Sequence, residues 1–135
     1  MKNICHLALV FSLLMLSAAC SRAQTTDKTA QATVAEFEAL VSENTEIQLL
    51  DVRRPEEFAE GMLAGSLNMN VLEEEQFMEQ IKALDPQKPV AVYCRSGRRS
   101  MKAAEILEAQ GFTRIYNLSG GILDWQEEGK AVEKQ

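Results

Sequence analysis

The sequence predicts an α/β fold, with a central parallel sheet of about five short strands and helices on both faces. Two observations lead to this prediction. Short apolar runs of strand length alternate with amphipathic stretches of helical period, and glycine or proline residues separate them. Strands that alternate with helices pair in parallel, and helices cover both faces of such sheets. The length of 135 residues is enough for one domain. The sequence contains no internal repeat.

Local signals place each element in turn. Helices are expected at residues 34–42, 55–60, 73–84, 101–110 and 122–128, and strands at 47–52, 66–69, 90–93 and 113–118. Thr33 and Glu36 have the spacing of a capping box at the start of the first helix. Pro55 suits the first turn of the second helix, and Gly61 ends it. Gly111 stops the fourth helix in the same way.

One predicted strand delivers a cysteine to the edge of the sheet where ligands bind. Cys94 follows the strand at 90–93, and Asp51 lies at the carboxyl end of the strand at 47–52. Ligands of parallel sheets bind outside the carboxyl ends of the strands. A polar loop and a helix follow Cys94, so inward-pointing N–H groups and the helix N-terminus supply positive charge. Both lower a thiol pKa from about 8.5, which predicts a thiolate nucleophile at Cys94.

The loop after this cysteine has the composition of an anion site. Its members are Arg95, Ser96, Gly97, Arg98, Arg99 and Ser100. The three arginines concentrate positive charge in a chain whose formal net charge is −6. The glycine allows the backbone to curl without a Cβ clash. Both serines can donate hydrogen bonds to sulfur, although Ser100 also suits a helix N-cap. The alternative is a buried structural cysteine beside a solvated basic turn.

The first residues have the pattern of an exported protein. A charged start precedes an apolar run too short for a comfortable membrane span, so residues 1–19 are predicted to be a signal peptide. The segment Leu16-Ser17-Ala18-Ala19-Cys20 resembles the lipobox of bacterial lipoproteins, which implies lipidation of Cys20 and a tethered periplasmic protein. Ser17 departs from the lipobox, which has leucine there. Cleavage after Ala23 would instead give a soluble periplasmic protein, and an uncleaved anchor is a third alternative.

Removal of a signal peptide would restrict the chemistry of the mature chain. Small polar residues at 20–32 predict a flexible tether, followed by one domain at 33–135. The only histidine, His6, and one cysteine, Cys5, lie in the predicted signal peptide, which leaves Cys94 alone in the folded domain. An internal disulfide, a Cys/His zinc site and a Cys–His catalytic pair are then excluded.

The same sequence features limit the partners that we expect. We expect neither a metal nor a cofactor. The acidic net charge disfavours non-specific binding to nucleic acid. No segment indicates an oligomer, so we expect a monomer that meets the membrane only through a lipid on Cys20.

Three segments, in order along the chain, match the signatures of one family. They are Leu49–Asn68, the loop that begins at Cys94, and Leu118–Gly121 with Trp125. Together they resemble the rhodanese-like sulfurtransferases, especially the single-domain secreted forms. Met62 stands where the family commonly has histidine, and Ala64 where it commonly has proline. The resemblance spans nearly all of residues 33–129.

This resemblance implies a single rhodanese-like domain with thiosulfate sulfurtransferase activity. Cys94 would carry a sulfane sulfur as a persulfide, from an anionic donor such as thiosulfate to a thiol or cyanide acceptor. Residues 95–99 would complete the six-residue active-site loop. Asp51 and Arg53 match family positions that support this region by hydrogen bonding and charge pairing. Arg98 and Arg99 are the side chains that we expect to bind the donor.

Three other functions match parts of the pattern. A cysteine-dependent phosphatase also holds a thiolate in an anion loop, but it needs arginine six positions after the cysteine, where this chain has Ser100. It also commonly has histidine before the cysteine, where this chain has Tyr93. A non-catalytic rhodanese-like binding module typically lacks the cysteine altogether. A thiol–disulfide exchange protein would have to act between molecules, because no second cysteine is expected nearby.

Overall fold

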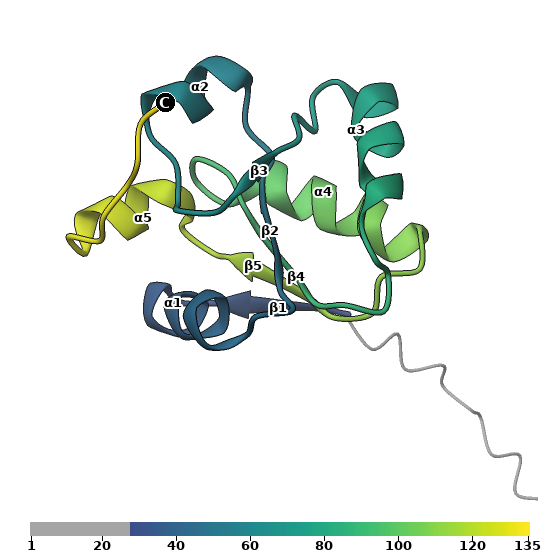
Figure 1. Ribbon diagram of the computed structural model, residues 1–135, viewed down its shortest axis with the longest axis horizontal. Helices are drawn as coiled ribbons and strands as arrows, with labels where there is room; N and C mark the ends of the chain where they lie inside the picture. The colour runs from purple at the N-terminus through teal and green to yellow at the C-terminus, as the bar shows by residue number, and fades with distance from the viewer. Residues whose placement is uncertain (1–27) are drawn as a thin grey trace, which may run out of the picture.

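Five parallel strands form one sheet in the order β1-β5-β4-β2-β3 (Figure 1). The structure is a computed structural model that describes residues 28–135. The strands are β1 (Thr29–Ala32), β2 (Gln48–Asp51), β3 (Leu67–Asn68), β4 (Val90–Tyr93) and β5 (Ile115–Leu118). The helices are α1 (Val34–Glu43), α2 (Pro55–Glu60), α3 (Glu74–Gln80), the 3-10 helix η1 (Ile81–Ala83), α4 (Arg98–Ala109) and α5 (Gly121–Glu127). The predicted α/β fold with a five-stranded parallel sheet is confirmed.

Helices cover both faces of the sheet, as predicted (Figure 1). Side chains of β4 alternate between two apolar clusters. Ala91 and Tyr93 belong to the cluster under α1 and α5, whereas Val92 and Cys94 belong to the cluster under α3 and α4. All four residues of β4 are fully buried. Burial of each large apolar side chain stabilises the fold by about 1.5–3 kcal/mol. The central strand therefore holds the start of the Cys94 loop rigidly.

The predicted tether at residues 20–32 extends too far along the chain. Thr29–Ala32 form the edge strand β1 and pair in parallel with β5, so the described fold begins before residue 33. The segment Thr-Ala-Gln-Ala has no apolar alternation, which is why composition indicated a tether. Backbone hydrogen bonds hold it instead, and the Ala32 carbonyl accepts from the Ser119 N–H at 3.1 Å. This strand supplies the fifth member of the sheet, for which the sequence had indicated no position.

The predictions for the first 27 residues concern a part of the chain that the structure does not describe. The predicted signal peptide at 1–19, the lipidation site Cys20 and the first part of the tether lie outside the described residues. Between residues 28 and 135, no helix is long and apolar enough to cross a membrane.

Two helices differ from their predicted bounds. The helix expected at 73–84 is α3 followed by η1, and the apolar side chain of Met78 is 38% exposed. Phe77 and Ile81, four positions apart on the same face, fill that part of the core instead. The helix expected at 101–110 begins earlier, at Arg98, with Gly97 as its N-cap.

We predict that a chain beginning at residue 33 is less stable than one beginning at residue 28. It lacks β1 and exposes the edge of β5, and each backbone hydrogen bond contributes about 0.5–1.5 kcal/mol. The expected loss is about 2 kcal/mol or more in the free energy of unfolding, measured by urea denaturation of both chains. Equal stabilities would show that β1 contributes nothing to the fold.

Candidate active site

The Cys94 loop lies where two neighbouring strands lead in opposite directions. From β2 the chain crosses outward to β3, and from its neighbour β4 it crosses to β5 on the other side. Such a switch point opens a crevice at the carboxyl ends of the strands. Asp51 ends β2 and Cys94 follows β4, so the structure brings together the two sheet-edge residues that the sequence singled out.

The start of α5 holds the loop from one side. The N–H of Ile122 donates to the Cys94 carbonyl at 2.9 Å, and the N–H of Leu123 donates to the Arg95 carbonyl at 3.2 Å. The loop and helix approach so closely that a Cβ on Gly121, whose φ is +64°, would lie 2.4 Å from the Arg95 oxygen. Carbonyl and N–H groups of one peptide unit point in opposite directions. Because these carbonyls face α5, the following N–H groups face away from it.

Gly97 completes the turn of the loop. Its φ is +99°, and a Cβ there would lie 2.0 Å from the carbonyl oxygen of Ser119. A side chain at this position would therefore be both strained and without space. This contact explains in physical terms why the loop needs glycine at its third position after Cys94.

The Cys94 thiol is surrounded by hydrogen-bond donors. Cys94 is 1% exposed, and the N–H of Gly97 donates to its Sγ at 3.0 Å. The hydroxyl of Ser100 lies 3.4 Å from Sγ and 3.0 Å from the Gly97 carbonyl oxygen. Its single proton serves one acceptor at a time, and a negative charge on sulfur would favour the sulfur. Ser100 is the third residue of α4, so it is not the N-cap that the sequence also allowed.

These donors outweigh the cost of burial for the thiolate. Burial by itself raises the pKa of Cys94, but hydrogen bonds from the Ser100 hydroxyl and from the N–H groups of Ser100, Gly97 and Ser96 lower it. The net effect is a pKa below the ordinary thiol value. The first turn of α4 adds its partial positive charge on the same side. The thiolate predicted from the sequence therefore has a physical basis in the fold.

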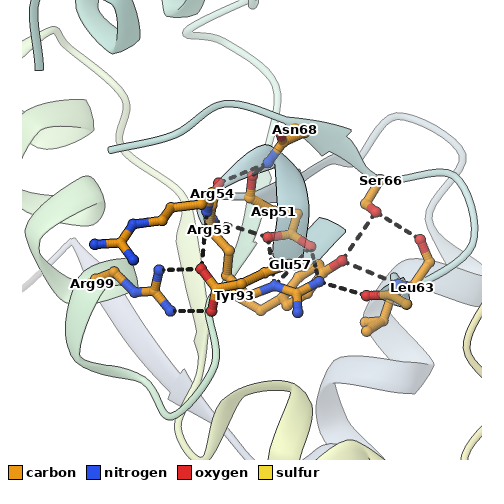
Figure 2. A network of polar contacts seen from close by, with 10 residues as sticks. Asp51, Arg53, Arg54, Glu57, Leu63, Ser66, Asn68, Tyr93 and Arg99 are labelled. Atoms are coloured by element: carbon orange, nitrogen blue, oxygen red, sulfur yellow. Dashed lines mark hydrogen bonds and ion pairs between the residues drawn. The ribbon is translucent and has the colours of Figure 1, made fainter. Parts of the chain in front are cut away.

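The three arginines of the loop have different environments. Arg99 forms a two-pronged ion pair with Glu57 of α2, with N–O distances of 2.7 and 2.8 Å (Figure 2). The Arg99 hydrogen bonds lower the pKa of Glu57 to about 2. Arg95 and Arg98 are exposed, and neither side chain forms a hydrogen bond or ion pair with another residue of the range 28–135.

The Arg99–Glu57 ion pair is a contact that sequence reasoning missed. The two residues are 42 positions apart, and an acidic residue such as Glu57 in the first turn of a helix is explained by the helix dipole alone. The N–H of Arg54 also donates to Glu57 at 3.1 Å, so the carboxylate caps its own helix while it holds the loop (Figure 2). The acidic residues that follow Pro55 were the only available signal.

Asp51 and Arg53 form a buried ion pair behind the loop. The Arg53 guanidinium contacts the Asp51 carboxylate at 2.6 Å (Figure 2), and it donates to the Gly61 carbonyl at 2.6 Å. It also lies 5.7 Å from the ring centroid of Tyr93. These contacts connect the end of β2 with both ends of α2. Removal of either charge would leave the other buried and unpaired, which is strongly destabilising.

A small cavity opens between the loop, α2 and α5. Its volume is about 230 Å³, and Arg95, Glu57, Glu60 and Leu123 are among the residues that line it. A larger cavity of about 450 Å³ lies between α2 and α3, but no residue of the range 94–100 lines it. Arg95 is thus the residue of the loop that lines the smaller cavity, and Cys94 lines neither of the two. Among residues 28–135, no three His, Cys, Asp or Glu side chains could hold a metal ion together.

A cysteine held by loop N–H groups between a parallel strand and a helix defines an α/β protein with a thiolate anion-binding loop. The family model for the rhodanese-like domain matches residues 33–128, and the chain belongs to this family. The family resemblance of the sequence is thereby confirmed.

Curated relatives include proteins of different stated activities. The chain is 40% identical over 84 residues to YqhL of Bacillus subtilis, an uncharacterized protein, covering 62% of this chain and 64% of that one. It is 33% identical over 92 residues to a sulfurtransferase of Allochromatium vinosum, covering 68% and 83%. It is 36% identical to a tRNA uridine(34) hydroxylase of Pelagibacter ubique, covering 63% of this chain and 28% of the relative.

Solved structures share the fold. The polysulfide-sulfur transferase homodimer of Wolinella succinogenes superimposes with a TM-score of 0.66 at 32% identity, covering 80% of each chain. Relatives named as sulfurtransferases thus support transfer of sulfur-containing groups as the activity class of this family member.

We predict that replacement of Ser100 by alanine raises the pKa of Cys94. The variant loses a hydroxyl donor to the thiolate, and hydrogen bonds to charged groups contribute about 1.5–3 kcal/mol. Alkylation by iodoacetamide should fall as pH drops through the pKa in both proteins, with a higher midpoint in Ser100→Ala. Near neutral pH the variant should react about threefold to tenfold more slowly.

Ser96→Ala is the matched control, because the Ser96 side chain is exposed and only its N–H lowers the thiol pKa. The same midpoint in Ser100→Ala and the unchanged protein would contradict the role given to the hydroxyl.

We predict that Glu57→Gln destabilises the protein at neutral pH but not in strong acid. The folded-state pKa of Glu57 is lowered from 4.5 to about 2, so its ion pair stabilises the fold above the unfolded-state pKa. That contribution is lost as pH falls through the folded-state pKa. Because the pair is partly exposed, the loss near pH 7 should be about 1 kcal/mol, measured by urea denaturation.

The difference between the two proteins should shrink as pH falls from about 5 to about 2. Glu56→Gln, one position earlier on an exposed side chain, should show no such trend. A difference independent of pH would argue that the ion pair does not stabilise the fold.

Proposed function

We propose that this protein is a sulfurtransferase that moves a sulfane sulfur from thiosulfate, or a related anionic donor, to a thiol or cyanide acceptor. The sulfur is carried as a persulfide on Cys94. The observation that supports this proposal best is the buried Cys94 thiol, whose pKa is lowered by donors from the loop and from Ser100. The relationship to sulfurtransferases supports the same class of reaction.

In the first step, the Cys94 thiolate attacks the outer sulfur of thiosulfate. A bond forms between Sγ and that sulfur, while the bond between the two donor sulfurs breaks. Its electron pair leaves with sulfite. The products are the persulfide anion Cys94–S–S⁻ and one sulfite dianion, so charge is conserved at −3.

In the second step, an acceptor nucleophile takes the terminal sulfur. Cyanide gives thiocyanate and a thiolate gives a new persulfide, and in each case Cys94 leaves as the thiolate. The N–H groups of the loop stabilise negative charge at both stages, as an oxyanion hole does for oxygen. Two separate half-reactions on one nucleophile give ping-pong kinetics.

The two exposed arginines of the loop, Arg95 and Arg98, attract the anionic donor by their charge. Thiosulfate is a dianion, and Arg95 and Arg98 are the loop cations without an ion pair within residues 28–135. Arg99 is held by Glu57, so we assign it to the positioning of the loop against α2 and not to the donor. This assignment replaces the sequence-based choice of Arg98 and Arg99.

We also propose that the enzyme acts outside the cytoplasm. The apolar start of the chain and the lipobox-like sequence before Cys20 support export and a lipid tether in the periplasm. The donor, the acceptor and the membrane anchor are then the contacts expected of a monomer with no nucleic-acid partner.

We predict that the purified protein forms thiocyanate from thiosulfate and cyanide. Incubation with thiosulfate should add the mass of one sulfur atom, and Cys94→Ser should lose both signals because it cannot form the persulfide. The measurements are a colorimetric thiocyanate assay and intact-protein mass spectrometry. Ser96→Ala is the control for substitution within the loop.

Neither signal in a folded protein would overturn the proposed function. Hydrolysis of a generic aryl phosphate would then support the phosphatase alternative. Absence of that activity as well would leave a rhodanese-like binding module. A mass gain without thiocyanate would support the persulfide and direct attention to other acceptors.

A further inference from the structure

Ser119, between β5 and α5, lies against a residue that supplies a backbone donor to the Cys94 sulfur. The N–H of Gly97 donates to Sγ at 3.0 Å, and a Cβ on Gly97 would lie 2.0 Å from the Ser119 carbonyl oxygen. Because a carbon–carbon bond is about 1.5 Å long, the Gly97 Cα itself lies within about 3.5 Å of that oxygen. The Ser119 carbonyl therefore limits the positions that the Gly97 peptide can take.

The edge strand β1 holds Ser119 in turn (Figure 1). The carbonyl oxygen of Ala32 accepts from the Ser119 N–H at 3.1 Å, and the Ser119 hydroxyl lies 3.2 Å from the same oxygen. Ala32 is 3% exposed and belongs to the apolar cluster under α1 and α5. Because both donors of Ser119 reach one carbonyl of a buried residue, the end of β1 determines where Ser119 lies.

Gln31, the neighbouring residue of β1, reaches the helix that follows the Cys94 loop. Its Nε2 group lies 2.9 Å from the Met101 Sδ in α4, and its Oε1 accepts from the Asn117 Nδ2 at 2.9 Å. Asn117 is 1% exposed, so the Gln31 amide is anchored at a buried residue of β5. Met101 directly follows Ser100, whose hydroxyl lies 3.4 Å from the Cys94 Sγ. The amide thus connects β1 to the turn of α4 that carries a second donor.

Two donors to the sulfur therefore have a neighbour that is bound to the same strand. The Gly97 N–H is bounded by Ser119, and the Ser100 hydroxyl precedes Met101 in the first turns of α4. Donors stabilise a charge effectively when the fold holds them in place before the charge develops. Strand β1 supplies part of that constraint from the edge of the sheet.

We propose that β1 positions the donors of the Cys94 thiolate, with Gln31 and Ser119 as the positioning residues. For sulfur transfer this inference rests on the proposed function, because the same donors would stabilise the persulfide. It gives a functional reason for the strand whose composition indicated only a tether.

Thr29 provides a matched control on the same strand. Its hydroxyl donates to the Glu108 carboxylate at 2.6 Å, near the end of α4 and far along the helix from Ser100. Thr29 and Gln31 are two positions apart, so their side chains lie on the same face of the strand. Thr29→Val removes a contact between β1 and α4 but leaves both positioning residues in place.

The first measurement is the pH dependence of Cys94 alkylation by iodoacetamide. Gln31→Met and Ser119→Ala remove the side-chain hydrogen bonds, and each should raise the midpoint of the profile. Near neutral pH, alkylation should be about twofold to threefold slower in each variant and about fivefold to tenfold slower in the double variant. Above all the midpoints the rates should converge, because the thiol is then fully ionised in every protein.

None of these substitutions alters a charge. The arginines of the loop, the Arg99–Glu57 pair and the Arg53–Asp51 pair therefore act on the thiol in every variant. Urea denaturation confirms that each variant is folded before its profile is measured. A shift of the midpoint then reports the donors and not a changed field.

The second measurement is the rate at which thiosulfate adds one sulfur to Cys94, followed by intact-protein mass. Near neutral pH, the double variant should load about fivefold more slowly than the unchanged protein. Thr29→Val should keep both the alkylation midpoint and the loading rate.

Unchanged midpoints in Gln31→Met and Ser119→Ala would overturn the inference. An equal shift in Thr29→Val would also overturn it, because the effect would then come from general loosening of β1. Slow alkylation that persists at alkaline pH would indicate altered access to the thiol, with the same consequence. If thiosulfate adds no sulfur even to the unchanged protein, the proposed function fails, whereas the alkylation midpoints still decide whether β1 positions the donors.

Discussion

The opposed directions of the loop carbonyls and N–H groups are the constraint on which the site depends. The carbonyls of Cys94 and Arg95 accept hydrogen bonds from α5, so the N–H groups that follow them point away from α5, and the N–H groups of Ser96 and Gly97 act on the Cys94 sulfur. Gly121 and Gly97 permit the close approach that this arrangement requires, since a Cβ at either would overlap a backbone oxygen. A buried thiol thus acquires stabilising dipoles without a neighbouring histidine or a metal.

The short helix α2 connects this loop to the sheet. Glu57 binds Arg99 at the start of α4 (Figure 2), and Arg53, paired with Asp51, donates to the Gly61 carbonyl at the end of α2. The three arginines of the loop therefore have two different roles. One arginine is neutralised and positions the backbone, while two remain exposed at the surface. Of these two, Arg95 directly follows Cys94 in the sequence and lines the small cavity between α2 and α5.

Several parts of the fold and site could be read from local patterns, and others could not. Strand β4 has the predicted bounds, and Cys94 is placed as expected, because a buried strand and a glycine-containing turn are local features. Strand β1 was missed because its stability comes from pairing with β5 and not from its own side chains. The start of α4 was placed too late, since Gly97 rather than Ser100 ends the loop.

The sequence by itself determined the alternation of strands and helices, the reactive cysteine and the loop that surrounds it. These depend on residue types over short distances: apolar period, glycine freedom and the donors of a few consecutive peptides. Only the tertiary structure decided which arginine is neutralised and which charges face the cavity. Glu57 and Arg99 meet across 42 positions, and such a contact depends on where the fold places the start of α2 relative to the start of α4 and not on either segment alone.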